Sequence, residues 1–333
     1  MNHARRRALV VASIFLVLAL TSLSDAQLRK LNIAYTATSP YQAALIIAKE
    51  AGLLRKNGLD VSMIFTTGGS LGIQAMVSGD VAMTLSDGSS AVISKLGGVD
   101  VLILASLLNT FPYSLIAIPE IKQVSQLKGT AVAVSRFGSA TDVAVRMALA
   151  KLGLNAEKDV TLLQIGVQTA RFAALQSKNV QSTIITPPFT LTARKLGYNT
   201  LIDMEQLNIP YQLTALLASR SYIKEHPDVV LSVVRALSEA IHLYKREKES
   251  SLKILSKYLK TDDREALDET YREVALKTLP EKPYPTLAGV QTILNELASR
   301  NPKAKSMRPE EFVDSSFVKK LDDEGFFERL YRR

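Results

Sequence analysis

The chain of 333 residues contains no cysteine. This absence excludes disulfides, cysteine-ligated zinc, iron–sulfur clusters, thiol nucleophiles and a lipid anchor at a signal cleavage site. Histidine is also scarce, and beyond residue 26 the chain has only His226 and His242. Both fall in a region of helical periodicity and belong to no set of nucleophile, base and orienting acid. We therefore expect no catalytic residue, no metal site and no cofactor.

Apolar runs long enough to cross a membrane are lacking as well. The run at residues 8–20 is shorter than the roughly 20 residues that span a bilayer. It follows the basic stretch 5–7, and residues 24–26 (SDA) place small side chains where a signal peptidase requires them. The pattern predicts a signal peptide over residues 1–26, cleaved after Ala26, and a mature protein without stable membrane insertion. An uncleaved N-terminal anchor is the alternative.

The sequence also lacks a concentrated basic patch. The formal charge is +9, and the predicted signal segment carries three arginines and one aspartate, which leaves about +7. These charges are spread along the chain, whereas nucleic-acid-binding proteins concentrate them and interleave aromatic residues. We expect no nucleic-acid partner. A diffuse positive charge favours anionic small ligands, or serves solubility alone.

What the sequence does contain is a regular alternation of strand-like and helix-like segments, typical of an α/β fold with largely parallel sheets. The length favours two compact lobes over one domain. We expect strands at residues 30–35, 61–66, 81–85, 101–107, 114–118, 130–134, 160–165, 182–186, 200–202 and 212–218. The C-terminal part has helical periodicity at residues 227–246, 249–259, 264–277, 286–299 and 316–331.

Residues 69–81 and 168–180 loosely resemble each other. In both, a short helix and a polar turn precede an apolar strand, which ends in a polar tip at residues 86–88 or 186–188. The similarity indicates two lobes built alike. Each lobe would then offer a helix N-terminus and a strand tip to one shared cleft.

Four polar loops follow the predicted strands, at residues 36–41, 66–70, 86–90 and 135–139. Ligands bind beyond the carboxyl ends of strands in open α/β sheets, and helix N-termini suit anions. The loops therefore predict a ligand-binding cleft between the lobes. The predicted ligand-binding residues are Ser39, Tyr41, Gly69, Ser70, Asp87, Ser89, Phe111, Arg136, Gly138, Ser139, Thr186 and Pro188.

Four of these residues indicate different kinds of ligand. Arg136 could pair an anionic group in bidentate fashion, or it could steady its own loop through a salt bridge. An apolar aromatic ligand would stack on Tyr41 and Phe111 instead. Asp87 could accept a hydrogen bond from the ligand.

Asp142 has a structural interpretation. It lies three residues after Ser139, so the two residues are expected to form a near capping box at the helix that begins there.

Several short stretches resemble a known family. They are IAKEAGL (47–53), GLDV (58–61), GGS (68–70), SGDV (78–81), RFAALQS (171–177) and TPP (186–188). The chain resembles the type II periplasmic substrate-binding proteins of ABC importers for nitrate, alkanesulfonates, taurine and thiamine-pyrimidine precursors. The resemblance runs from about residue 30 to about residue 222, and the Arg136-Phe137 pair departs from it.

The resemblance implies two lobes that close on a ligand by a hinge. Lobe 1 would comprise residues 27–118 and 212–333, and lobe 2 residues 119–211. It also implies ligand contacts at Tyr41, Gly69, Ser70, Ser89, Ser139 and Pro188. The implied protein is a periplasmic monomer that delivers a small, anionic or polar ligand to an ABC permease. The alternatives are an enzyme similar to thiamine-pyrimidine synthase, which uses a histidine and a cysteine-rich motif, and a ligand receptor for a membrane sensor.

Overall fold

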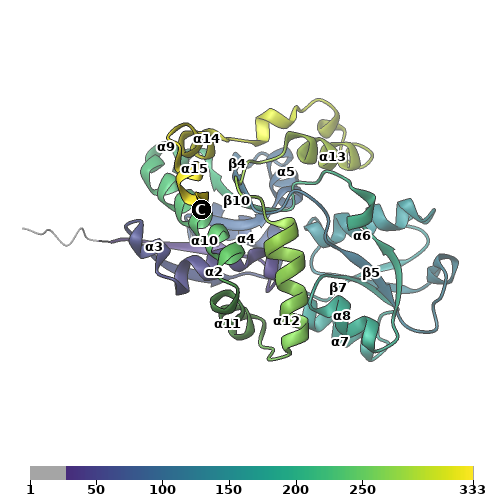
Figure 1. The fold of residues 1–333 in the computed structure, drawn as a ribbon. Helices are drawn as coiled ribbons and strands as arrows, with labels where there is room; N and C mark the ends of the chain where they lie inside the picture. The colour runs from purple at the N-terminus through teal and green to yellow at the C-terminus, as the bar shows by residue number, and fades with distance from the viewer. Residues whose placement is uncertain (1–27, 333) are drawn as a thin grey trace, which may run out of the picture.

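The computed structural model describes residues 28–332, so the predicted signal peptide and its cleavage site lie outside the described residues. Two five-stranded sheets form the framework, and helices flank both (Figure 1). The first sheet, which defines lobe 1, has the strand order β2 (Leu59–Phe65), β1 (Arg29–Tyr35), β3 (Met83–Asp87), β10 (Thr214–Ser219) and β4 (Val101–Ser106).

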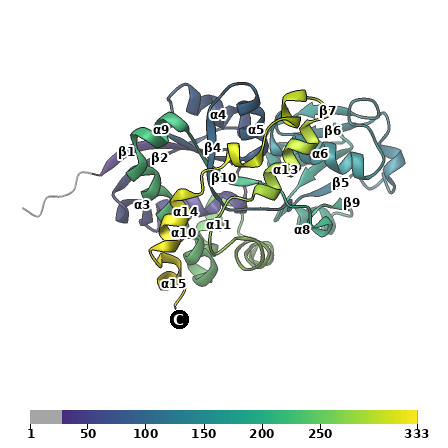
Figure 2. The same cartoon turned by 90° about the horizontal axis from the view of Figure 1, so that it is seen from above.

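The second sheet, which defines lobe 2, has the equivalent order: β7 (Thr161–Gln164), β6 (Ala131–Val134), β8 (Ser182–Ile185), β5 (Ser114–Ala117) and β9 (Asn199–Asp203). In each sheet the first three strands are parallel and the fourth is antiparallel to both neighbours. Strands β3 and β8 therefore hold equivalent places, as the similarity of their sequences predicted. Figure 2 shows the two sheets side by side along the long axis of the molecule.

One predicted boundary between the lobes is wrong. The sequence predicts that residues 114–118 belong to lobe 1, but β5 pairs with β8 and β9 in the second sheet. The first crossover therefore lies at residues 107–113, and the return crossover at residues 204–213 leads back to β10. Both crossovers run between the sheets at the level of the predicted cleft.

The helices between strands follow the predicted alternation. Lobe 1 contains η1 (Pro40–Gln42), α2 (Ala43–Glu50), α3 (Leu53–Lys56), α4 (Gly69–Val77) and α5 (Gly88–Leu96). Lobe 2 contains η2 (Val124–Leu127), α6 (Ala140–Lys151), α7 (Gln168–Gln176), α8 (Phe189–Lys195) and η3 (Glu205–Leu207). Helices α4, α5, α6 and α7 each begin just after a strand or its loop, so their N-termini face the space between the lobes.

The C-terminal part is helical, as predicted, and the long helix expected at residues 316–331 is interrupted at Gly325, whose φ is +67°. Its elements are α9 (Arg220–Glu225), α10 (Pro227–Arg246), α11 (Lys248–Leu259), α12 (Arg264–Thr270), the π-helical η4 (Tyr271–Thr278), α13 (Leu287–Leu297), η5 (Pro302–Lys305), η6 (Pro309–Phe312), α14 (Ser316–Asp323) and α15 (Phe326–Tyr331). Helix α10 packs on α2 and α3 through valines and leucines at helical spacing.

One C-terminal segment also touches lobe 2. Helix α12 and η4 lie between the two halves of the molecule (Figure 1). Lys195 of α8 forms an ion pair with Glu265 at 2.7 Å, and Lys277 of η4 forms one with Glu205 at 2.9 Å. These ion pairs connect the lobes away from the two crossovers. Within residues 28–332, no helix is long and apolar enough to cross a membrane.

Candidate functional site

The cavity between the lobes is walled by the ends of strands from both sheets. It has two adjoining compartments, in which the space open to the centres of water-sized molecules is about 70 Å³ and about 60 Å³. Eight residues line both compartments: Thr36, Ala37, Ser39, Gly68, Tyr113, Ser135, Thr141 and Thr186. The four loops predicted from the sequence all contribute to these walls, so a cavity lies where the cleft was expected. Ligand binding in it stays a prediction.

Asp87 contributes a carboxylate to the lining of the first compartment. It ends β3 and is the N-cap of α5, and only 7% of the residue is exposed. Its Oδ1 accepts hydrogen bonds from the Ser89 hydroxyl and the Ser90 backbone N–H, and its Oδ2 accepts one from the Ser90 hydroxyl at 2.9 Å. Burial raises the pKa of Asp87, and these hydrogen bonds oppose the rise. The backbone N–H of Ala140, the first residue of α6 in lobe 2, also lowers this pKa.

Arg171 lines the second compartment. It is the fourth residue of α7, and only 3% of its surface is exposed. Its guanidinium donates to the carbonyl oxygens of Gly166 at 2.5 Å and Ile184 at 3.2 Å, while Nε has no hydrogen-bond partner among the described residues. Burial lowers the pKa of Arg171 to about 10, which still leaves the side chain charged at neutral pH.

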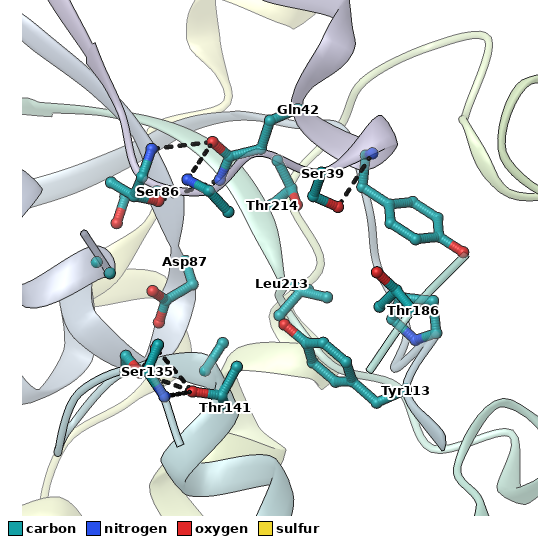
Figure 3. Close-up of a pocket in the computed structure, with 18 residues that line it drawn as sticks. Ser39, Gln42, Ser86, Asp87, Tyr113, Ser135, Thr141, Thr186, Leu213 and Thr214 are labelled. Carbon is teal, nitrogen blue, oxygen red and sulfur yellow. Dashed lines mark hydrogen bonds between the residues drawn. The ribbon is translucent and has the colours of Figure 1, made fainter. Parts of the chain in front are cut away.

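Tyr113 lines the same two compartments as these charged residues. It comes from the first crossover. Burial raises the pKa of Tyr113, the negative charge of Asp87 raises it further, and the positive charge of Arg171 opposes both effects. Figure 3 shows Asp87 and Ser135 on one side of the first compartment, with Tyr113 and Thr186 on the other. Tyr113 is therefore influenced by a negative charge that lines one compartment and by a positive charge that lines the other.

Local hydrogen bonds hold the loops of the cavity in place. Gln42 Oε1 accepts from the backbone N–H groups of Thr36 and Ala37 at 3.0 and 3.2 Å, and its amide donates to the Thr36 hydroxyl. In lobe 2, the Ser135 hydroxyl contacts the Ser139 and Thr141 hydroxyls at 2.8 and 2.7 Å. Buried donors and acceptors that are already paired in this way keep a polar wall rigid.

Six of the twelve predicted residues line the cavity: Ser39, Tyr41, Gly69, Asp87, Ser139 and Thr186. Ser139 occupies the N-cap position of α6, but its hydroxyl donates to the Arg136 carbonyl oxygen at 2.7 Å. Asp142 accepts from the N–H of Gly138 and not from that of Ser139, so the predicted capping box is wrong. Ligand contact by the six residues stays a prediction.

Arg136 does not line either compartment. Its side chain lies against Gly68, where an added Cβ would be 3.1 Å from Arg136 Cγ. Gly68 has a φ of +82°, so its backbone belongs to the region that favours glycine. Arg136 thus crosses from lobe 2 to cover the loop before α4, while the buried cation at the cavity is Arg171.

Phe111 and Ser89 are buried behind the cavity walls. Phe111 is fully buried and stacks on Tyr211 with a ring-centroid distance of 3.7 Å, so it packs the two crossovers together. A ligand stacked on both Tyr41 and Phe111 is therefore inconsistent with this arrangement. Ser89 acts on the cavity only through Asp87, to which its hydroxyl donates.

The other three predicted residues also lie outside the lining. Ser70 is in the first turn of α4 and is half-buried. Gly138 has a φ of +75°, and its carbonyl accepts from the Ser90 hydroxyl of lobe 1 at 3.4 Å, so it contributes to the contact between lobes. Pro188 is the N-cap residue of α8. Ser70 and Pro188 therefore lie outside both compartments, and their contact with a ligand stays a prediction.

Sequence patterns do not identify four residues of the cavity lining: Arg171, Tyr113, Thr141 and Gln42. Arg171 belongs to the RFAALQS stretch, which carries the family resemblance but does not indicate a ligand contact. Its position three residues after Gln168 and four before Leu175 places it on the buried face of α7, which was the available signal. Tyr113 could be placed only once the end of the first crossover was known.

The two histidines lie away from the cavity. His226 contacts Tyr222 and His242 contacts Tyr331, with ring-centroid distances of 4.7 and 4.8 Å. Among residues 28–332, no group of three or more histidine, aspartate or glutamate residues is placed to hold a metal ion.

Residues 39–249 match the family profile described as NMT1/THI5 like. The chain belongs to this family. The range that matches the NMT1/THI5-like family begins four residues after β1. It includes the other four strands of the first sheet, all of lobe 2, and helices α9 and α10. The protein YtlA of Bacillus subtilis (strain 168) is 27% identical over 239 residues, which cover 69% of this chain and 71% of YtlA.

Solved structures share the fold of this NMT1/THI5-like chain. The alkanesulfonate-binding protein SsuA from Xanthomonas axonopodis pv. citri, bound to MOPS, has a TM-score of 0.72 at 20% identity and covers 86% of this chain and 98% of SsuA. The periplasmic nitrate-binding protein NrtA from Synechocystis PCC 6803 has a TM-score of 0.75 at 16% identity, covering 90% and 89%. The predicted two-lobed periplasmic-binding-protein fold is confirmed.

Proposed function

We propose that the protein is an extracytoplasmic solute-binding protein that captures a small anionic or polar ligand between its lobes. The observation that carries this proposal is the cavity lined by strand ends, helix N-termini and a crossover from both lobes. A ligand there contacts two rigid bodies at once, so its binding free energy favours the closed arrangement over an open one.

Delivery to the permease of an ABC importer is the second part of the proposal. It is supported by membership of the NMT1/THI5-like family and by a fold shared with SsuA and NrtA, whose names describe binding proteins. The predicted signal peptide supports a periplasmic location for the mature protein, and NrtA is described as a periplasmic protein. In this role the protein is not an enzyme: its ligand is released unchanged.

An enzyme similar to thiamine-pyrimidine synthase is the less favoured candidate. Such an enzyme supplies a histidine and uses a cysteine-rich motif, whereas this chain has no cysteine. Neither His226 nor His242 lines either cavity compartment. The carboxylate of Asp87 is engaged by three hydrogen bonds as a helix cap and has no histidine beside it to complete an acid–base pair.

Native mass spectrometry of gently purified protein tests the proposal, combined with small-angle scattering. We expect a co-purified small molecule and, after its removal and readdition, a decrease in radius of gyration. A protein that retains no small molecule and keeps the same scattering profile with every candidate would contradict ligand capture. A chemically altered product after incubation would favour the enzyme. A ligand receptor for a membrane sensor would bind its ligand and close in the same way. Genes for a permease and an ATPase next to the gene for this protein would indicate an importer.

A further inference from the structure

We propose that the ligand is a small zwitterion, whose oxyanion is bound by Arg171 of lobe 2 and whose ammonium group is bound by Asp87 of lobe 1. The inference rests on the proposed ligand-binding function and names its substrate class.

The argument begins with the donors of Arg171. A guanidinium carries five N–H groups, and carbonyl oxygens accept from two of its nitrogens here. Nε lacks a partner, and Arg171 forms no ion pair with any residue between 28 and 332. A buried charge without a counter-charge is unfavourable, and neutral carbonyls do not remove it. An oxyanion in the second compartment would both neutralise the guanidinium and accept its remaining hydrogen bonds.

Asp87 carries a buried negative charge, which would be compensated by a cation. Every donor that reaches its carboxylate is neutral: the hydroxyls of Ser89 and Ser90, and the backbone N–H groups of Ser90 and Ala140. Within the part of the chain that the structure describes, the carboxylate makes no ion pair, although it is nearly fully buried at the wall of the first compartment. A ligand that carries only an anion would leave this charge uncompensated, and would lie close to it. A ligand with an ammonium group compensates it.

The two charges belong to different lobes. Asp87 ends a strand of the first sheet and Arg171 belongs to a helix of lobe 2, and the compartments that they line adjoin through shared walls that include Tyr113 and Ser135. A zwitterion that spans both compartments therefore links the lobes through two ion pairs. The limited space in each compartment restricts the ligand to a short chain between its charged ends.

The test uses probes of matched length. Purified protein, freed of bound ligand by mild unfolding and refolding, is titrated calorimetrically with ω-aminoalkanoates and ω-aminoalkanesulfonates of two to five carbons. The alkanoate, alkanesulfonate and alkylamine of each length serve as single-charge counterparts. We expect at least one zwitterion to bind at least about tenfold more tightly than both of its counterparts. The carboxylate and sulfonate series together identify the oxyanion.

Asp87→Asn then isolates one charge. Asparagine can keep Oδ1 as the acceptor for Ser89 and Ser90, while Nδ2 donates to the Ser90 hydroxyl, so the cap of α5 is retained. We expect this variant to bind the zwitterion and the oxyanion counterpart within about threefold of each other. Arg171→Gln should remove the preference over the alkylamine, and Arg171→Lys should restore part of it. Arg220→Gln, which changes an exposed arginine paired with Asp100, is the control.

Equal affinity of wild type for a zwitterion and its oxyanion counterpart would overturn the role of Asp87. A panel in which no zwitterion binds would overturn the whole inference, as would a co-purified ligand without a cationic group. Neither result removes ligand capture itself, because the co-purified molecule and the scattering change test that function separately. If Arg171→Gln does not fold, the Asp87→Asn comparison still decides the question.

Discussion

Gly69 lies directly against the carboxylate of Asp87, so closely that a Cβ at position 69 would be 1.9 Å from Asp87 Oδ2. The same Cβ would be 2.3 Å from the Ser90 hydroxyl oxygen. Because Gly69, the first residue of α4, has no side chain, the carboxylate of Asp87 can occupy this space. Two helix N-termini, those of α4 and α5, approach one buried acid from the same lobe.

Gly69→Ala is expected to destabilise the protein by about 1–3 kcal/mol, because either α4 must shift or Asp87 must leave its capping position. Val77→Ala, at an exposed position of the same helix, is the matched control and should stay within about 0.5 kcal/mol of wild type. Urea unfolding followed by circular dichroism measures both. A Gly69→Ala variant as stable as the control would contradict the close approach.

Much of the fold could be predicted because alternating apolar segments of strand and helix length repeat along the chain. Strands β1, β3 and β6 were placed within about two residues of their observed ends. The sheet that β5 joins could not be predicted, since a four-residue strand with three buried apolar residues fits the pattern of either lobe. Only its pairing with β8 and β9 decides this, and that pairing fixes where the first crossover begins and ends.

The site was predictable where it follows a strand and unpredictable elsewhere. Ser39, Asp87 and Thr186 lie at strand ends, where the topology of α/β sheets directs ligands. Arg171 lies within a helix, and its spacing looks like that of an ordinary core position. Its burial beside a polar cavity depends on how α7 packs against β8, which no local pattern encodes.

The N-terminus provides an independent prediction. Mature protein isolated from its native compartment should begin at Gln27, because the basic stretch, the apolar run and the small residues before position 27 match a signal peptide. N-terminal sequencing checks this directly. Met1 on protein from the extracytoplasmic fraction would refute cleavage.

Arg136→Ala should cost less than about 1 kcal/mol of ligand affinity, since Arg136 covers Gly68 at the edge of the cleft and lines neither compartment. A rim charge acts mainly on the association rate, so the remaining effect should shrink at high salt. Calorimetry and stopped-flow kinetics with the co-purified ligand separate the two quantities. A loss of more than about 2 kcal/mol would instead place Arg136 on a buried anion in the ligand-bound form.

Lys277→Gln should weaken ligand binding by less than about fivefold at low salt, because the ion pair of Lys277 with Glu205 stabilises the arrangement in which the lobes meet. The effect should disappear near 1 M salt, where the screening length is about 3 Å. Lys257→Gln removes an ion pair with Glu50 inside lobe 1 and serves as the control. Equal weakening by both variants would show that the contact between lobes is not involved.

The last prediction concerns the stability of ligand-free Asp87→Asn as a function of pH. Burial raises the pKa of Asp87 above its unfolded value, so the folded state binds this proton more tightly than the unfolded state. At neutral pH the wild type carries the cost of a buried carboxylate, which the variant lacks. As the pH falls through the folded pKa of Asp87, the wild type takes up the proton and recovers that stability.

We therefore expect Asp87→Asn to be at least as stable as wild type at pH 7, with a difference that narrows as the pH falls and levels off below about pH 4, near the pKa of an unfolded aspartate. Urea unfolding of both ligand-free proteins between about pH 8 and about pH 3.5 gives this difference directly, and other titrating groups cancel because they are common to both. A wild-type advantage at pH 7 that is lost on acidification would mean that the pKa of Asp87 is lowered in the folded protein. Such a result would mean that the hydrogen bonds of Ser89, Ser90 and Ala140 to the carboxylate outweigh its burial. It would also remove the reason for Asp87 to select an ammonium group.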